Sequence, residues 1–254
     1  MLHQRSTRLF LFLGGFFIAN AIIAEFIGVK IFALEATLGW QPFEWHLFGV
    51  TGTLQFTCGV ILWPFVFILT DIINEYFGQR GVRFLSYLTA GLISYAFAMV
   101  YLAMVMSPAD WWTTSNTANG VPNMQNAFAA IFGQGMWIII ASLVAFMLSQ
   151  LLDVYIFHWV KQRTGERYLW LRATGSTLVS QLIDSFVVLY IAFVLGPQHW
   201  SVERFLAIAI VNYCYKFLAA FALTPLVYAI HYAVEAYLGE HLSEKLKKGA
   251  IGEE

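Results

Sequence analysis

Charged residues are scarce in this chain of 254 residues, which has 14 Lys plus Arg and 15 Asp plus Glu. They make up 11% of the sequence, whereas soluble domains carry roughly 25%. Hydrophobic residues account for 59% and fall in runs long enough to cross a bilayer. The composition therefore excludes intrinsic disorder and predicts an integral membrane protein whose main partner is the lipid bilayer.

Cysteine and the common catalytic motifs are also lacking. Cys58 and Cys214 both lie in apolar runs, and the six histidines are scattered without HExxH or paired spacing. No P-loop, GxSxG or GxGxxG context occurs, so we expect no metal, no cofactor, no nucleotide hydrolysis and no serine chemistry. A net charge of -1 excludes a nucleic-acid partner bound through a basic patch.

The apolar runs predict an all-α membrane protein with six transmembrane helices in one polytopic domain. Each run is long enough to span the roughly 30 Å hydrocarbon core at about 1.5 Å per residue. The predicted spans cover residues 9–34, 57–77, 83–106, 135–160, 174–195 and 204–237, and residues 238–254 form a tail.

Basic residues predict the orientation. Eleven of them fall in the N-terminal tail, the two even-numbered loops and the C-terminal tail: Arg5, Arg8, Arg80, Arg83, Lys161, Arg163, Arg167, Arg172, Lys245, Lys247 and Lys248. The opposite face has only Arg204. The positive-inside rule therefore places both termini in the cytoplasm. On the outer side, residues 49–56 alternate weakly and predict a short hairpin or a re-entrant piece after the first helix, and residues 125–132 predict an interfacial helix.

Polar residues inside the spans are the candidates for function, because each ionisable group there costs about 2.5–3.5 kcal/mol on insertion scales. Counting residues from the end of each span places the deepest of them in one slab, roughly 6 Å thick. The candidates for substrate binding are Asp71, Asn74, Gln150, Asp153, Gln181, Asp184, Asn212 and Lys216. Glu25, nearer the outside, and Glu75, nearer the cytoplasm, are candidates for coupling or gating.

A short internal repeat supports a common site. Residues 149–153 and 180–184 both read Ser-Gln-Leu-aliphatic-Asp, 31 residues apart on consecutive antiparallel spans. Repeats in corresponding spans are one indication of a transporter's central site. The alternative is structural, since buried acids and bases can pair and Ser, Gln and Asn can join helices. However, three deep acids, at 71, 153 and 184, face the single deep base Lys216, which leaves at least two negative charges for protons, cations or a ligand to satisfy.

The polar motifs resemble the queuosine precursor transporters, also called the vitamin uptake transporter family. The segment PFVFILTDIINEYFG at 64–78, followed by basic residues, is similar to the family signature after the first outer loop. Three later family blocks follow in the same order, at residues 142–153, 170–184 and 212–228, so that the likeness covers about residues 15–235.

The resemblance implies a six-helix bacterial inner-membrane protein that imports the cyano and aminomethyl deazaguanine precursors of queuosine for tRNA modification, as a secondary carrier. A carboxylate can accept two N–H groups from a guanine-like edge, and an amide or ammonium group can donate to its carbonyl. One hypothesis is that Asp184 or Asp153 accepts, while Gln181, Gln150 or Lys216 donates. Asp71 or Glu75 would then take a proton or meet the aminomethyl cation.

Two other classes are consistent with the sequence. A membrane subunit that binds another vitamin-like molecule, energised by a separate ATPase, also commonly has six spans and no nucleotide motif. An intramembrane enzyme would use the deep carboxylates as acid and base. Pairs of small residues such as Gly14 and Gly15 leave a homodimer open.

Overall fold

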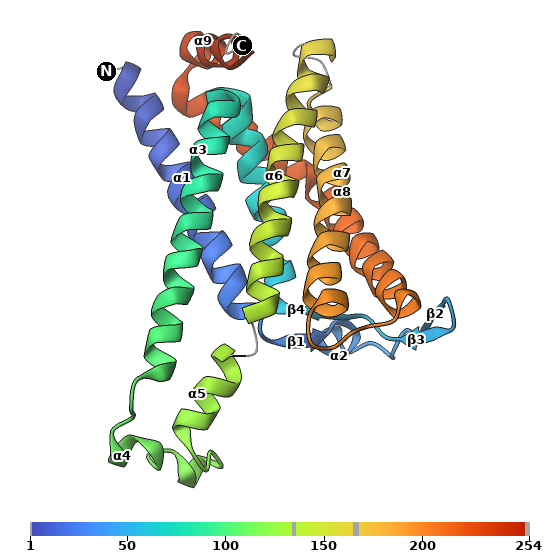
Figure 1. Cartoon of the computed structure of the whole chain (residues 1–254). Helices are drawn as coiled ribbons and strands as arrows, with labels where there is room; N and C mark the ends of the chain where they lie inside the picture. The colour runs from blue at the N-terminus through green and yellow to red at the C-terminus, as the bar shows by residue number, and fades with distance from the viewer. Residues whose placement is uncertain (1, 134–135, 165–167, 252–254) are drawn as a thin grey trace.

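Long helices dominate the computed structural model, which describes residues 2–133, 136–164 and 168–251. Within these residues, five helical stretches are long and apolar enough to cross a membrane. In Figure 1 they run along the molecule as α1, α3, α6, α7 and α8. Their bounds are Leu2–Ile27 (α1), Trp63–Val105 (α3), Met136–Thr164 (α6), Leu169–Leu189 (α7), which continues as a π-helical end at Tyr190–Leu195 (η3), and Val202–Leu238 (α8). An all-α, multi-pass membrane architecture is therefore confirmed.

The helix α3 is the longest element and contains a break. At about 1.5 Å per residue a straight helix of 43 residues would be about 65 Å long, twice the hydrocarbon thickness. Gly78 interrupts it with φ 69° and ψ -176°, in the left-handed region that glycine tolerates best. In Figure 1 the chain rises to the level of α9 and then descends along a second path. The predicted loop between the second and third spans is thus this turn, which keeps helical residues on either side of Gly78.

Small β elements close the lower end of the molecule in Figure 1. β1 (Ile31–Ala33) pairs antiparallel with β4 (Gln55–Thr57), and between them β2 (Trp45–Leu47) pairs antiparallel with β3 (Val50–Gly52). Phe48 and Gly49 join β2 to β3 with φ values of 50° and 76°, as a two-residue hairpin turn requires. A hairpin, one of the two predicted alternatives, therefore follows the first helix, but it spans residues 45–52 and begins four residues before the predicted segment 49–56, whose end lies in β4 instead.

Short helices complete both ends. α2 (Leu34–Leu38), η1 (Cys58–Ile61), α4 (Asp110–Thr113), η2 (Thr117–Asn119) and α5 (Met124–Gly133) lie at the end that carries the strands, and α5 matches the helix predicted at 125–132. At the opposite end, α9 (Glu240–Ile251) crosses the bundle beside the start of α1. The predicted tail is therefore largely helical.

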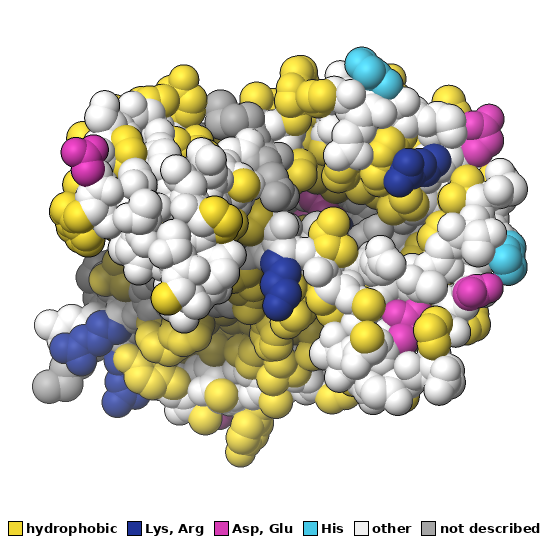
Figure 2. Space-filling model, turned by 90° about the horizontal axis from the view of Figure 1, so that it is seen from below, with side chains coloured by type: hydrophobic (Ala, Val, Ile, Leu, Met, Phe, Trp, Pro, Cys, Tyr) yellow, Lys and Arg dark blue, Asp and Glu magenta, His cyan; other side chains and the backbone are white. Residues whose placement is uncertain are grey.

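The other predicted boundaries differ by a few residues. α1 ends at Ile27, seven residues before the predicted end of the first span, because the chain turns at Gly28 and enters β1. Lys30 consequently lies outside the helix, on the same strand-bearing face as Arg204. The count of basic residues is then eleven on the predicted cytoplasmic face and two on the opposite face. Figure 2 looks onto that face, where Lys and Arg side chains appear only at scattered points among yellow hydrophobic side chains and white uncharged surface. Three of the predicted features fall outside the described residues: the start of the fourth span at Gly135, the base Arg167 and the last residues of the tail, 252–254.

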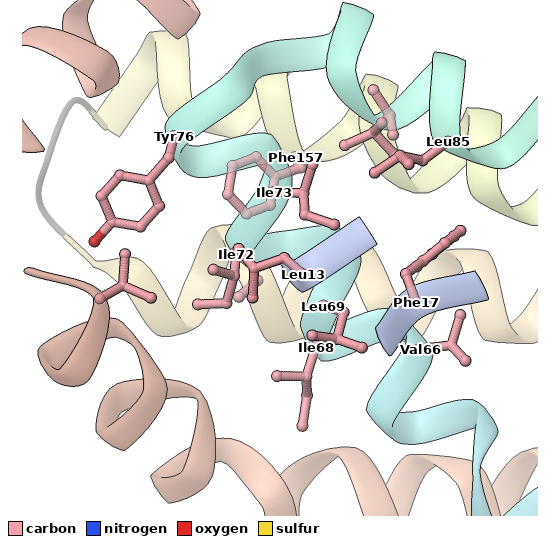
Figure 3. Close-up of a cluster of buried hydrophobic side chains, with 14 of the residues drawn as sticks. Leu13, Phe17, Val66, Ile68, Leu69, Ile72, Ile73, Tyr76, Leu85 and Phe157 are labelled. Carbon is pink, nitrogen blue, oxygen red and sulfur yellow. The ribbon is translucent and has the colours of Figure 1, made fainter. Parts of the chain in front are cut away.

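A hydrophobic core joins α1, α3 and α6 and fixes the first half of α3 in the bundle (Figure 3). Phe17 and Val66 are fully buried, and Ile72, Ile73 and Phe157 are 1% exposed. Many large apolar side chains outside this core are exposed, among them Phe12, Tyr101 and Leu218, as expected for a surface that faces lipid. The core therefore holds one face of residues 66–76 rigidly, and the polar side chains of the same segment point elsewhere in the bundle.

Candidate functional site

A small cavity lies between α3, α7 and α8. Its lining includes Asp71, Thr174, Thr177, Gln181 and Lys216, with apolar side chains of α3 and α8 around them. The space between the lining atoms is about 390 Å³, but the volume open to the centre of a water molecule is only about 20 Å³. This is room for about one water molecule, so the cavity is nearly closed in this conformation.

Asp71 is the carboxylate of this cavity. Its side chain is 4% exposed, and one oxygen, Oδ2, accepts a hydrogen bond of 3.4 Å from the Thr177 hydroxyl. The other oxygen, Oδ1, is buried and has no hydrogen-bond partner among the described residues. An unpaired buried acceptor costs about 1–3 kcal/mol, so the geometry leaves this oxygen ready for a donor from a ligand.

The opposite wall of the cavity carries an amide and an ammonium group. Gln181 is 3% exposed, and its Oε1 has no partner among the described residues. Lys216 also lines the cavity and donates to Asp184 Oδ2 at 2.5 Å, in an ion pair whose side chains are 8% and 17% exposed. Asp184 itself does not line the cavity. The lysine is thus held beside the cavity by a carboxylate that stands behind it.

Asp153 and Gln150 lie deeper between the helices and do not line the cavity. Both are fully buried. Gln150 Oε1 accepts from the Thr70 hydroxyl at 3.0 Å, and Asp153 Oδ1 accepts from the Ser180 hydroxyl at 3.0 Å. These bonds connect α6 to α3 and to α7, so both residues help to set the spacing of the helices around the cavity.

The internal repeat aligns across α6 and α7 as an antiparallel pair. Ser180 of the second copy bonds Asp153 of the first. In two antiparallel helices, moving four residues back along one helix corresponds to moving four residues forward along the other. Since Asp153 lies level with Ser180, Ser149 of the first copy lies level with Asp184 of the second. The reciprocal bond is not made: Ser149 donates to the Phe146 carbonyl, while Asp184 pairs with Lys216. The repeat is therefore symmetric in position and asymmetric in its bonds.

Glu75, one turn from Asp71 on α3, lies in an ion triad. Its carboxylate accepts two bonds from Arg172, from Nε at 3.1 Å and from Nη2 at 2.9 Å, and it contacts Lys161 Nζ at 3.2 Å. Lys161 also donates to the Glu75 carbonyl at 3.0 Å. All three side chains are 1–2% exposed. The triad ties α3, α6 and α7 together on the side of the cavity nearest Gly78.

The remaining predicted residues lie at the edges. Glu25 accepts a hydrogen bond from Ser142 and joins α1 to α6. Asn74 is 2% exposed, with an unpaired Nδ2, but is absent from the cavity lining. Asn212 is half-buried and donates to the Ile208 carbonyl of its own helix. Of the ten candidates, the structure thus brings Asp71, Gln181 and Lys216 to one cavity.

Several residues of the site were not among the candidates. Thr174, Thr177 and Ser180 supply hydroxyls next to the acids, but small hydroxyl residues are too common in apolar helices to be singled out without contacts. Lys161 and Arg172 were counted only as basic residues that set the orientation. The available signal for their shared role was their spacing. Lys161 ends α6 and Arg172 begins α7 on either side of one short connection, and two bases placed in this way can converge on a single acid.

Long apolar helices packed around a small cavity that holds a few buried polar side chains are typical of a multi-pass membrane transporter. A family model described as "Putative vitamin uptake transporter" matches residues 57–230, which include every candidate of the slab. The chain belongs to this family and is a transporter rather than an enzyme.

Curated relatives extend the comparison. A "Probable queuosine precursor transporter" of Bacillus subtilis (strain 168) is 34% identical over 186 residues, 72% of this chain and 73% of that protein. The "Queuosine precursor transporter" of Escherichia coli (strain K12) is 31% identical over 165 residues, 64% of this chain and 66% of that protein. A "Probable queuosine precursor transporter" of Haemophilus influenzae is 25% identical over 201 residues. No solved structure matches the chain significantly.

Proposed function

We propose that the protein imports deazaguanine precursors of queuosine, in the cyano and aminomethyl forms, across the bacterial inner membrane as a secondary carrier. The names of the relatives support the substrate class. The single observation that carries the proposal is the buried Asp71 oxygen without a hydrogen-bond partner, in a cavity that also holds Gln181 and Lys216.

The chemistry of the cavity suits the substrate. A guanine-like edge carries adjacent N–H donors beside a carbonyl acceptor, and a carboxylate can accept two such donors in parallel. Asp71 takes this role, while Lys216 or the amide of Gln181 donates to the carbonyl. Asp153 and Asp184, which the sequence favoured as acceptors, instead hold Ser180 and Lys216 in place.

Transport requires the cavity to open, because the present space is too small for a bicyclic ring system. The ion triad of Glu75, Arg172 and Lys161 closes the side nearest Gly78, and Glu25 lies near the end of α1 that leads into the strands. We assign Glu75 to a gate on the first side and Glu25 to the coupling region on the second. The glycine break lets the first half of α3 move relative to the second.

The orientation follows from the charge asymmetry. Because α3 turns back at Gly78, this one element crosses the membrane twice. The five apolar stretches of the described residues therefore give six membrane crossings. Both α1's start and α9 then lie in the cytoplasm, where eleven of the bases are found.

Uptake of radiolabelled precursor into cells that express the protein tests the proposal. Asp71→Asn keeps the shape and removes the charge, and we expect transport to fall by roughly 10- to 150-fold, the equivalent of about 1.5–3 kcal/mol for a hydrogen bond to a charged group. Asp110→Asn is the matched control, because Asp110 is exposed in α4. Equal uptake by the two variants at equal membrane abundance would remove Asp71 from the site.

Reconstitution separates a carrier from an ATPase-driven subunit. The purified protein alone in liposomes is expected to accumulate the precursor when a pH gradient is imposed, and an uncoupler is expected to abolish accumulation. Binding without accumulation would favour the subunit energised by a separate ATPase, and accumulation that survives the uncoupler would exclude proton coupling.

A further inference from the structure

A groove separate from the cavity runs between α1 and α8 on the membrane-facing surface. Its walls are two helical stripes, Arg8, Leu9, Phe12 and Leu13 from α1, and Ile230, Ala233, Val234 and Tyr237 from α8. The spacing of three and four residues puts each stripe on one helix face. The space between the walls is about 940 Å³.

The groove has a buried floor and an exposed rim. Leu9, Leu13 and Val234 are 4–8% exposed and close its base, whereas Phe12 and Tyr237 are 63% and 44% exposed and stand at the edge. A floor that is closed by protein and a wide apolar mouth suit a flexible hydrocarbon chain, which adapts to the groove without needing polar partners.

Positive charge gathers at one end of the groove. Arg8 lines it, and Arg5, one turn earlier on α1, donates from Nη1 to the Tyr237 carbonyl at 3.4 Å. Both arginines are exposed, and neither forms an ion pair with a carboxylate within residues 2–133, 136–164 and 168–251. Within the part of the chain that the structure describes, the two guanidinium groups above the apolar channel therefore have no carboxylate partner.

We propose that this groove binds an anionic phospholipid, with the phosphate at Arg5 and Arg8 and an acyl chain along the apolar walls. Basic pockets between transmembrane helices on the cytoplasmic side are suited to anionic headgroups. The orientation proposed above places the arginines in that leaflet. Along the helices, residues 230–237 cover about 11 Å, most of one leaflet of a hydrocarbon core roughly 30 Å thick.

A second copy of the chain fits the groove less well. A two-fold dimer brings the same patch of both copies together, so the arginines of one copy would face those of the other. Their repulsion would have to be overcome without any carboxylate in the groove lining. The bound lipid also ties α1 to α8, between which the groove otherwise leaves a gap.

Native mass spectrometry of the full-length protein tests the proposal with phosphatidylglycerol and phosphatidylcholine of the same chain length. We expect the wild-type protein to retain phosphatidylglycerol at least about tenfold better, and Arg5→Gln/Arg8→Gln to lose this preference. Arg80→Gln/Arg83→Gln removes the same charge from exposed positions near the α3 turn and should keep it. Equal retention by the two double variants would overturn the proposal.

Filling the groove provides a second, independent test. Ala233→Trp adds bulk at an exposed position of the groove and should displace the lipid, whereas Ala236→Trp, exposed on the same helix outside the groove, should not. Inorganic phosphate at millimolar concentration should leave retention unchanged, and competition by it would identify a free-anion site instead. Disulfide-linked dimers of an Ala233→Cys variant with Cys58 and Cys214 replaced would identify a second copy as the occupant and overturn the lipid assignment.

Discussion

Glu75 and Asp71, two buried acids one helical turn apart on α3, differ in the partners that surround their carboxylates. Glu75 is enclosed by Arg172 and Lys161, with every oxygen of its carboxylate paired. Asp71 is buried to a similar degree but receives a single long bond from a threonine hydroxyl. A compensated buried charge holds helices together, whereas an uncompensated one costs stability and is retained for a ligand or a proton. The comparison separates Glu75, which is compensated by two bases, from Asp71, which we propose for the binding site.

The largest expected effect comes from breaking the compensated group. Glu75→Gln leaves Arg172 and Lys161 buried without their acid, and we expect the free energy of unfolding to fall by about 3–5 kcal/mol, the cost of removing one partner of a buried pair. Thermal unfolding in detergent measures this. Glu244→Gln, which removes the acid of an exposed pair with Lys248, should change stability by less than about 1 kcal/mol. Similar losses in both variants would contradict the structural role of Glu75.

The second prediction sharpens the contrast at Asp71. Asp71→Asn removes a buried charge that has no basic partner among the described residues, so the stability of the protein should be unchanged or rise by about 1 kcal/mol, even though transport is expected to fall. The same unfolding assay, with the precursor added, checks both properties: the wild-type protein should be stabilised by ligand and the variant should not. A variant as unstable as Glu75→Gln would place Asp71 in the framework instead of the site.

An intermediate effect is expected for the pair of Lys216 and Asp184. Lys216→Met leaves Asp184, which is 17% exposed, without its base, at a cost of about 1–3 kcal/mol. The double variant Lys216→Met/Asp184→Asn should recover most of this stability but not transport, because Lys216 lines the cavity. Denaturant unfolding of Lys216→Met, of the single variant Asp184→Asn and of the double variant gives the coupling energy, and additive losses would show that the two residues act independently.

The smallest effect concerns an acid outside the spans. Burial acts to raise the pKa of Glu35 in α2, but N–H bonds from Leu54 at 2.7 Å and Phe43 at 3.3 Å outweigh it and hold the pKa below its usual value. The stabilisation is therefore complete above the usual glutamate pKa and is lost as the pH falls through the lowered one. Hydrogen exchange of the Leu54 amide should quicken at that acidic pH by about tenfold or less. In the Glu35→Gln variant, the Leu54 amide should exchange quickly at every pH. Protection equal to that of the wild-type protein would contradict the role of the Glu35 carboxylate in holding this amide.

Much of the fold was predictable because it depends on local patterns. Long apolar runs determine helices in a membrane irrespective of their neighbours, and the weakly alternating segment 49–56 supplies β3 and the start of β4, although the partner strand β2 lies before it. The cost of burying charge likewise made Asp71 and Lys216 visible as members of one slab. The turn at Gly78 was less accessible, since apolar residues continue on both sides of a single glycine.

The roles of the deep residues were not predictable to the same degree. Residue spacing gives depth along a helix, but the direction in which a side chain points depends on how each helix is rotated and packed. Asp184 therefore looked equivalent to Asp71 in depth, although the structure turns it toward Lys216 and away from the cavity. Lys161 and Arg172 looked like solvated bases at helix ends, and packing buried them.

The sequence by itself determined that this is a membrane protein, which face carries the positive charge, and which few ionisable residues lie deep enough in the spans to be candidates for the site. Those properties follow from composition and from distance along a helix, which neighbouring segments do not alter. Only the tertiary structure decided which acid is compensated and which is open, because compensation depends on side chains that come from three different helices. Asp71 and Glu75 are four residues apart in sequence, and their different partners distinguish the proposed binding site from its gate.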